Sequence, residues 1–118
     1  MSDCIFCRIA RGEIPSKKVY EDELIFAFHD IHPIAPVHFM IIPKRHIASL
    51  MDARAEDEPV LGRMLAKADE LARSLGLGEG FRTIINTGRI GNQEVYHLHM
   101  HVVGGPEPLG SMVARRAH

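Results

Sequence analysis

The sequence has no tryptophan, only two cysteines and no long apolar run, and these absences exclude several classes of protein. A helix that crosses a bilayer needs about 20 consecutive apolar residues, and no segment approaches that length. The start, Met-Ser-Asp-Cys, does not resemble a secretory signal peptide. We therefore expect a cytoplasmic, reducing location, where structural disulfides are rare.

Charge and composition limit the possible partners and the class of protein further. The formal net charge of −1 offers no basic surface, so we expect neither nucleic acid nor a membrane as a partner. The 118 residues are 46% hydrophobic and 25% charged, which suits one globular domain with its own core. The sequence has no internal repeat, low-complexity tract or linker, and we treat residues 1–118 as a single domain.

Hydrophobic periodicity predicts two helices and five strands. A short helix is expected over residues 4–11, capped by Ser2 or Asp3, and a long amphipathic helix from about residues 56–59 to Gly76. The strands are expected over residues 17–21, 24–29, 38–42, 82–86 and 96–103. Because most strands follow one another directly, we predict an α+β fold with an antiparallel five-stranded sheet, one long helix and one short helix.

The most informative pattern is Tyr-His-Leu-His-Met-His-Val-Val at residues 96–103. Alternate side chains of a strand share one face, so His97, His99 and His101 are predicted to lie together, with the apolar residues between them facing the core. Imidazole titrates near physiological pH, so each ring can be a nucleophile, a proton carrier or a metal ligand. The alternative is a solvated strand face that is merely rich in histidine.

A polar turn precedes the histidine strand. It contains Asn86, Thr87, Gly88, Gly91, Asn92 and Gln93. Glycines let backbone N–H groups approach an anion, and amide side chains add neutral donors. Beside three aligned histidines, this composition predicts a phosphate pocket, although the same residues also occur in ordinary turns.

Cys4 and Cys7 are two residues apart. A thioredoxin-type redox pair should follow a strand, but only three residues precede Cys4. A tetrahedral zinc site fits the spacing but needs two further ligands, and the pattern does not choose them among eight histidines. Two buried, unreactive thiols are the alternative.

Taken together, these features resemble the histidine triad (HIT) superfamily, and within it the Hint branch of nucleoside phosphoramidases. The resemblance is carried by residues 96–103 and by the motifs at residues 4–9, 12–15, 27–31, 35–38, 42–46, 85–88 and 93–95, and it covers nearly the whole chain. Three positions depart from the family pattern. Asn92 replaces a second glycine, Pro106 stands where a basic residue is common, and Glu94 is a serine in some relatives.

The resemblance implies a HIT-like fold, a homodimer and hydrolysis of purine nucleoside 5'-phosphoramidates or related AMP conjugates through a nucleotidyl-histidine intermediate. The implied catalytic residues are His99, His97, His101 and His38, with His99 as the nucleophile and His97 acting through its carbonyl. Asp30 is expected to bind the ribose hydroxyls, and the apolar contacts are expected to hold the purine. The implied nucleotide contacts are Ile5, Phe6, Ile9, Ile14, Phe28, His29, Asp30, Ile31, Asn86, Gln93, Glu94, Val95, His99 and His101.

The resemblance also implies a structural zinc ion held by Cys4, Cys7, His46 and His97, and no organic cofactor. Two other functions fit parts of the pattern. One is a nucleotide-binding or partner-binding module with little turnover. The other is a metalloenzyme that uses His97, His99 and His101 as ligands, but residues i and i+2 of a strand lie about 6.6 Å apart, too far for three rings to converge easily on one metal.

Overall fold

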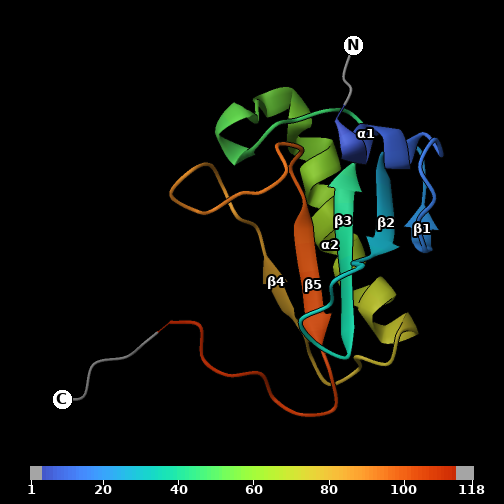
Figure 1. The fold of residues 1–118 in the computed structure, drawn as a ribbon, viewed down its shortest axis with the longest axis vertical. Helices are drawn as coiled ribbons and strands as arrows, with labels where there is room; N and C mark the ends of the chain where they lie inside the picture. The colour runs from blue at the N-terminus through green and yellow to red at the C-terminus, as the bar shows by residue number, and fades with distance from the viewer. Residues whose placement is uncertain (1–3, 114–118) are drawn as a thin grey trace.

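Five antiparallel strands form one sheet, and the long helix α2 packs on one of its faces (Figure 1). The computed structural model describes residues 4–113. The elements are α1 (Ile5–Ala10), β1 (Lys18–Glu21), β2 (Ile25–His29), β3 (Val37–Pro43), α2 (Glu58–Ser74), β4 (Arg82–Ile84) and β5 (Met100–Gly104), with short 3₁₀ turns at Leu50–Asp52 and Ala55–Asp57. The strand order is β1-β2-β3-β5-β4, so the predicted α+β fold is confirmed.

Helix α2 forms because its apolar residues recur every three or four positions. Its buried residues are Val60, Met64, Ala68, Leu71 and Ala72. They pack against the sheet and form the main core with residues such as Ile25 and Phe39. Pro59 lies in the first turn, where its missing N–H breaks no helical bond. The helix ends at Ser74, two residues before the predicted end at Gly76.

A second apolar cluster lies on the opposite face of the sheet, under α1. Its buried members are Phe6, Ile9, Phe26, Phe28, Met40 and Ile42, and we call it the α1-face cluster. Strand β2 is buried on both sides because its side chains alternate, with Ile25 and Ala27 in the main core and Phe26 and Phe28 in the α1-face cluster. The sheet is therefore a central layer with a helix on each side, and α1 covers only one end of it (Figure 1).

The cap of α1 differs from the prediction. Ser2 and Asp3 lie outside the described residues, and the structure has Cys4 as the N-cap residue. The Cys4 sulfur accepts a hydrogen bond from the backbone N–H of Cys7 at 3.1 Å. Pattern reasoning favours oxygen-bearing residues at this position and overlooks a thiol that can accept the same bond.

The last strand is shorter than predicted. Strand β5 begins at Met100 rather than at Tyr96, so His97 and His99 precede the paired strand, and only His101 lies within it. The sequence pattern did not reveal this break, because residues 96–99 alternate as regularly as residues 100–103 do.

Pro43 explains the early end of the ladder. The N–H of Lys44 donates to the carbonyl of Leu24 in the segment before β2, so the preceding residue, Pro43, directs its backbone toward β5. Proline has no N–H to donate there. The register would pair Pro43 with Leu98, but the N–H of Leu98 instead donates to the carbonyl of Ile47 at 2.7 Å.

Within residues 4–113, none of the helices combines the length and the apolar character needed to cross a membrane.

Candidate active site and metal cluster

His99 is held in one tautomer by the backbone. Its Nδ1 lies 2.8 Å from the carbonyl oxygen of His97. Because a carbonyl oxygen can only accept, Nδ1 carries the proton and Nε2 of the neutral ring keeps its lone pair. The ring is buried, and the edge of Phe6 packs against it with centroids 5.2 Å apart. His99 is thus an oriented imidazole, and Nε2 is the nitrogen that can act as a nucleophile.

A second pair of imidazoles lies beside His99. The N–H of Ile34 donates to Nδ1 of His38, so Nε2 of the neutral His38 ring carries the proton. That nitrogen lies 2.9 Å from Nδ1 of His101 and donates to it. His101 therefore accepts at Nδ1 and presents an N–H at Nε2. The rings of His99 and His101 are 5.0 Å apart, so this donor is close to the nucleophile.

Burial keeps this pair neutral near pH 7. Desolvation, followed by the neighbouring His99 and His38, lowers the pKa of His101 to about 4, and Asp30 opposes the shift. Desolvation also lowers the pKa of His38, again against the effect of Asp30. Asp30 Oδ2 lies 3.3 Å from Nε2 of His38 and 4.0 Å from Nδ1 of His101.

His97 points away from His99 and into a cluster with the cysteines. Its Nε2 donates to the carbonyl of Pro43 at 2.8 Å, the oxygen that the broken ladder leaves available. Its Nδ1 then keeps a lone pair, 3.2 Å from the Cys4 sulfur and 3.4 Å from the Cys7 sulfur. The ring is fully buried, and desolvation is the main reason that its pKa falls to about 4.

His46 completes this cluster. Its Nδ1 lies 3.2 Å from Nδ1 of His97 and 3.3 Å from the Cys7 sulfur. The four candidate ligand atoms of Cys4, Cys7, His46 and His97 all lie within 4.8 Å of one another. Two sulfurs and two imidazole nitrogens are a donor set that suits a closed tetrahedral metal site. The residues therefore fit the metal site that the resemblance implied.

Asp30, His38 and His101 form another group close enough to hold a metal. The tautomers oppose this. Nε2 of His38 must carry a proton as long as Nδ1 accepts from Ile34, and a protonated nitrogen cannot ligate a metal. We therefore interpret this group as a hydrogen-bonded chain that sets the donor on His101.

The three histidines of the motif do not share one site. His97 belongs to the cysteine cluster and His101 to the Asp30 group, and within residues 4–113 His99 belongs to neither group. A metal centre built from His97, His99 and His101 is therefore wrong. The physical reason is the early end of the ladder, which lets the His97 ring turn toward Pro43 and the cysteines.

A groove of about 680 Å³ is lined in part by His38. Its lining includes three residues that the resemblance assigned to nucleotide binding, His29, Asp30 and Ile31. It also includes residues that sequence reasoning did not assign, namely Pro15, Ser16, Lys17, Pro33 and Pro36. These lie in the loop before β1 and in the loop after β2. The prolines in these two loops were the feature of the sequence that could have indicated them. The volume is in the range of small-molecule sites.

The other expected apolar contacts are spread over different environments. Phe6, Ile9 and Phe28 are buried in the α1-face cluster, and Ile14 and Val95 pack against it half-buried. Ile5 and Ile31 are exposed, Ile31 by 84%. A buried side chain supports the wall of a groove, whereas an exposed one must gain its contact from a ligand or a partner.

The backbone N–H groups of the polar turn make hydrogen bonds within the turn itself. The N–H groups of Gly91, Asn92 and Gln93 donate to carbonyls within residues 87–89. The N–H of Gly88 donates to the Gln93 side chain at 2.9 Å. These four amides are already bonded, so an anion near this turn would need other donors. Asn92 has φ of 59°, a left-handed conformation that asparagine tolerates better than most residues. Asn86 follows β4 half-buried, and Glu94 is exposed beyond the turn.

Comparison with known proteins agrees with this arrangement. The profile of the HIT domain matches residues 11–107. The chain belongs to the HIT domain family. It is 50% identical over 115 residues to the purine nucleoside phosphoramidase of Escherichia coli strain K12, covering 97% of this chain and 96% of that protein. It is 52% identical over 106 residues to protein HitA of Neisseria gonorrhoeae, covering 90% and 99%.

Solved structures of HIT proteins share the fold. A HIT family hydrolase from Clostridium thermocellum superposes with a TM-score of 0.89 at 39% identity, covering 96% of this chain and 99% of that one. A HIT family hydrolase from Legionella pneumophila superposes with a TM-score of 0.85 at 48% identity, covering 89% and 95%.

Proposed function

We propose that this HIT protein hydrolyses purine nucleoside 5'-phosphoramidates or related AMP conjugates, with His99 as the nucleophile. The observation that carries the proposal is the orientation of the His99 ring. Its Nδ1–H is bonded to the His97 carbonyl, so its Nε2 lone pair is directed away from the backbone and beside the His101 ring. The 50% identity to a protein named purine nucleoside phosphoramidase supports the substrate class.

The reaction would proceed in two displacements. The Nε2 lone pair of His99 attacks the α-phosphorus and a P–N bond to the ring forms. The substrate's own P–N bond breaks, and its nitrogen, which has taken a proton from solvent, leaves as the neutral amine. Water then attacks the phosphorus and loses a proton to solvent, while the bond to Nε2 breaks and the nucleoside monophosphate departs. Covalent catalysis of this kind divides one difficult displacement into two easier ones.

His101 and His38 would assist through hydrogen bonding. The N–H at Nε2 of His101 can donate to a phosphoryl oxygen, where negative charge grows in each transition state. His38 holds His101 in the tautomer that makes this donor available. Since both rings stay neutral, His101 would stabilise the phosphoryl oxygen through a hydrogen bond and not through a positive charge.

The nucleoside would occupy the groove that His38 helps to line. Asp30 would accept hydrogen bonds from the ribose hydroxyls, and His29 and Ile31 would contact the nucleoside. Ile5, Phe6, Ile9, Ile14 and Phe28 would provide the apolar surface for the purine. Asn86, Glu94 and Val95 would close the phosphate end.

The cysteine cluster would hold one structural zinc ion through Cys4, Cys7, His46 and His97. The two thiols and two imidazoles, all within 4.8 Å, support this assignment. A closed four-ligand site activates no water, so zinc would contribute to folding and not to the chemistry. It would fix α1 against the segment that carries His97.

We further propose that the protein acts as a homodimer in the cytoplasm. Strand β4 is at the edge of the sheet, where its outer backbone groups can pair with a second copy. Helix α2 also presents an exposed large apolar residue, Leu65. Light scattering of wild type and of Leu65→Glu tests this state, since the charge should weaken a dimer that uses the helix.

A substrate panel tests the activity directly. Purified protein would be assayed on adenosine and guanosine 5'-phosphoramidates, acyl-AMPs and dinucleoside polyphosphates. We expect fastest turnover on the purine phosphoramidates. A rapid acid-free quench should also trap one nucleotide per subunit on His99, identified by mass spectrometry. Tight binding of AMP without turnover of any panel member would instead support a binding module.

A further inference from the structure

The side chain of Gln93 is buried, with 7% of its surface exposed, and joins three segments of the chain. Its Oε1 accepts from the N–H of Gly88 at 2.9 Å. Its Nε2 donates to the carbonyl of Ala48 at 2.7 Å and to the carbonyl of Val95 at 2.9 Å. We call these three bonds the carboxamide lock.

The lock uses both hydrogens of the Gln93 amide. A primary amide has two N–H donors, and each one is directed at a backbone carbonyl. A third partner, such as a phosphoryl oxygen, could gain a donor only if one of these bonds broke, which would take the donor from a half-buried carbonyl. The geometry therefore does not suit Gln93 as a direct ligand of the substrate.

The lock lies where the sheet does not hold the chain. Residues 94–99 lie outside the β3–β5 ladder, which begins at Met100. In their place, the segment Ile47–Ala48 supplies two carbonyls, one to Leu98 at 2.7 Å and one to Gln93 at 2.7 Å. Gln93 and Leu98 thus bracket the bend that leads to His99, whose ring orientation depends on the carbonyl of His97.

We propose that Gln93 is a positioning residue, which sets the backbone that orients His99 and does not touch the substrate. This inference deepens the proposed hydrolase function and rests on it for the effect on turnover. Loss of the lock should change the catalytic rate by releasing the bend, while the groove for the nucleoside stays intact.

The first test needs no substitution. Gln93 is the only glutamine in the sequence, so its side-chain ¹⁵N–H₂ signals can be separated from those of the asparagines. In the wild-type protein, saturation with AMP should leave both signals at their positions and in slow exchange with solvent. A large shift or a change in exchange rate on adding AMP would overturn the proposal, because it would mark the amide as a ligand.

The second test uses two variants. Gln93→Glu keeps the size and the acceptor for Gly88 but loses both donors, and Gln93→Met keeps the length without polar atoms. We expect kcat for adenosine 5'-phosphoramidate to fall at least tenfold, with the Kd for AMP within about twofold of wild type. The ¹⁵N signals of His99 should move from one tautomer toward a mixture, and the Leu98 amide should exchange faster.

Ser49→Ala is the matched control. Ser49 is buried next to Ala48, and among residues 4–113 its side chain bonds within its own turn, to Asp52 and Met51. It should lower the melting temperature without moving kcat or the His99 signals, which separates the lock from general loosening of this loop. A Gln93 variant with weakened AMP binding and an unchanged His99 tautomer would overturn the proposal. If the wild type hydrolyses no phosphoramidate, the proposed function fails, whereas the tautomer and exchange readouts still decide the role of Gln93.

Discussion

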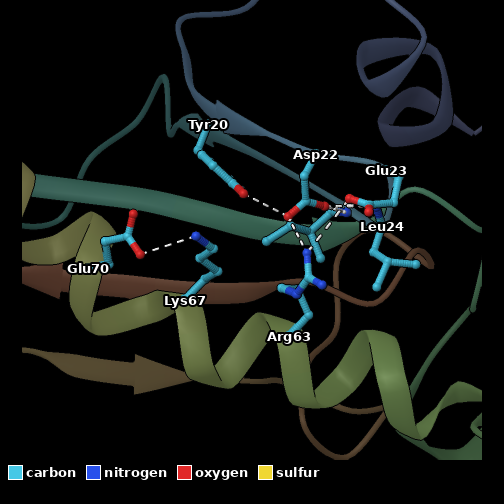
Figure 2. Close-up of polar contacts among 8 residues, drawn as sticks. Tyr20, Asp22, Glu23, Leu24, Arg63, Lys67 and Glu70 are labelled. Carbon is cyan, nitrogen blue, oxygen red and sulfur yellow. Dashed lines mark hydrogen bonds and ion pairs between the residues drawn. The ribbon is translucent and has the colours of Figure 1, made fainter.

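Two regions of this protein are dense in ionisable side chains, and they use them in opposite ways. One is the network around Asp22 and Arg63 between the β1–β2 connection and α2 (Figure 2). The other is the histidine face, the set formed by His38, His97, His99 and His101 on the opposite side of the sheet.

In the Asp22 network every charge faces an opposite charge or a donor. Asp22 Oδ2 accepts from Arg63 at 2.6 Å and from the Tyr20 hydroxyl at 2.8 Å, while Oδ1 accepts from the N–H groups of Leu24 and Ile25 (Figure 2). Burial alone would raise the pKa of Asp22, but these donors outweigh it and hold the pKa well below its ordinary value.

The same pattern continues along α2. Lys67 pairs with Glu70 at 3.1 Å, as Figure 2 shows, and its Nζ lies 4.8 Å from the centroid of the Tyr20 ring. Each polar atom named here already has its partner in the protein. The network therefore fastens the hairpin to the helix.

On the histidine face the groups are bases, and burial lowers the pKa of His38, His97 and His101. Hydrogen bonds to backbone groups fix which nitrogen carries the proton in His38, His97 and His99, and the His38 ring fixes it in His101. His97 and His99 each keep a lone pair for a metal or a phosphorus atom, and His101 keeps an N–H for a phosphoryl oxygen. Polar groups whose hydrogen bonds are all made within the protein indicate a structural role. Ring nitrogens that are held in a fixed orientation and still have a lone pair or an N–H to offer indicate a binding or catalytic site. The five predictions below test this contrast.

The largest effect is expected from His99→Ala. Loss of the covalent path should reduce kcat for adenosine 5'-phosphoramidate by at least about 10³-fold, or roughly 4 kcal/mol. Calorimetry should find AMP binding retained. Turnover within tenfold of wild type would contradict the assignment of His99 as the nucleophile.

Removal of the metal should affect stability before activity. Protein purified without chelator should contain one zinc per chain by atomic absorption, and Cys7→Ser should lose it. The unfolding free energy should fall by several kcal/mol, because metal binding is coupled to folding. Arg45→Ala, next to His46 but not a ligand, is the control and should keep its zinc. A stoichiometry near zero, with both thiols titratable in the folded protein, would leave the half-buried Cys4 and the buried Cys7 as ordinary packing side chains.

Asp22→Asn tests the network that has no role in the site. Placing an amide against Arg63 should cost about 2 kcal/mol in chemical denaturation, with kcat unchanged. Glu23→Gln is the matched control, because Glu23 lies 3.8 Å from Arg63 with a side chain 77% exposed, and it should cost less than about 0.5 kcal/mol. A kcat change in Asp22→Asn would show that the two regions are coupled.

The two regions should lose stability in different pH ranges. A histidine whose folded pKa is lowered to about 4 stays neutral while the unfolded chain takes up a proton, so His101 should cost stability as the pH falls from 6.5 toward 4. The pKa of Asp22 is also lowered in the folded state, so its effect has the same sign, but its contribution is kept until the pH falls below 3.8. Denaturation curves at several pH values check this. In His101→Gln, the fall in unfolding free energy between pH 6.5 and 4 should be smaller than in wild type, by on the order of 2 kcal/mol. Asp22→Asn should leave the fall in this pH range unchanged.

The smallest effect is expected at Asn92, where the backbone φ is 59°. Asn92→Gly should change the unfolding free energy by less than about 0.5 kcal/mol, whereas Asn92→Val should cost about 1 to 2 kcal/mol in this left-handed conformation. Thermal melts of the two variants measure the difference. Equal stability would mean that the turn can adopt another conformation.

Periodicity by itself determined much of the fold. The 3.6-residue repeat of apolar side chains fixes α2, because such a stripe can be buried only against another layer. The directly successive strands fix an antiparallel sheet, since short connections allow no crossover. The motif at residues 96–103, with the shorter motifs along the chain, was also enough to select the HIT family. That resemblance then implied the group of Cys4, Cys7, His46 and His97 that the structure brings together.

Only the tertiary structure decided which of those residues belong to the metal cluster and which belong to the candidate active site. Pro43 is far from the histidine motif in sequence, yet its missing N–H ends the ladder at Met100 and gives its carbonyl to the His97 ring. Likewise, the Ile34 N–H sets the tautomer of His38, and Ala48 binds the Gln93 amide. A pattern along one chain reports which side chains share a period. It does not report which distant backbone groups lack a partner, and those groups determine here which ring nitrogen keeps its lone pair.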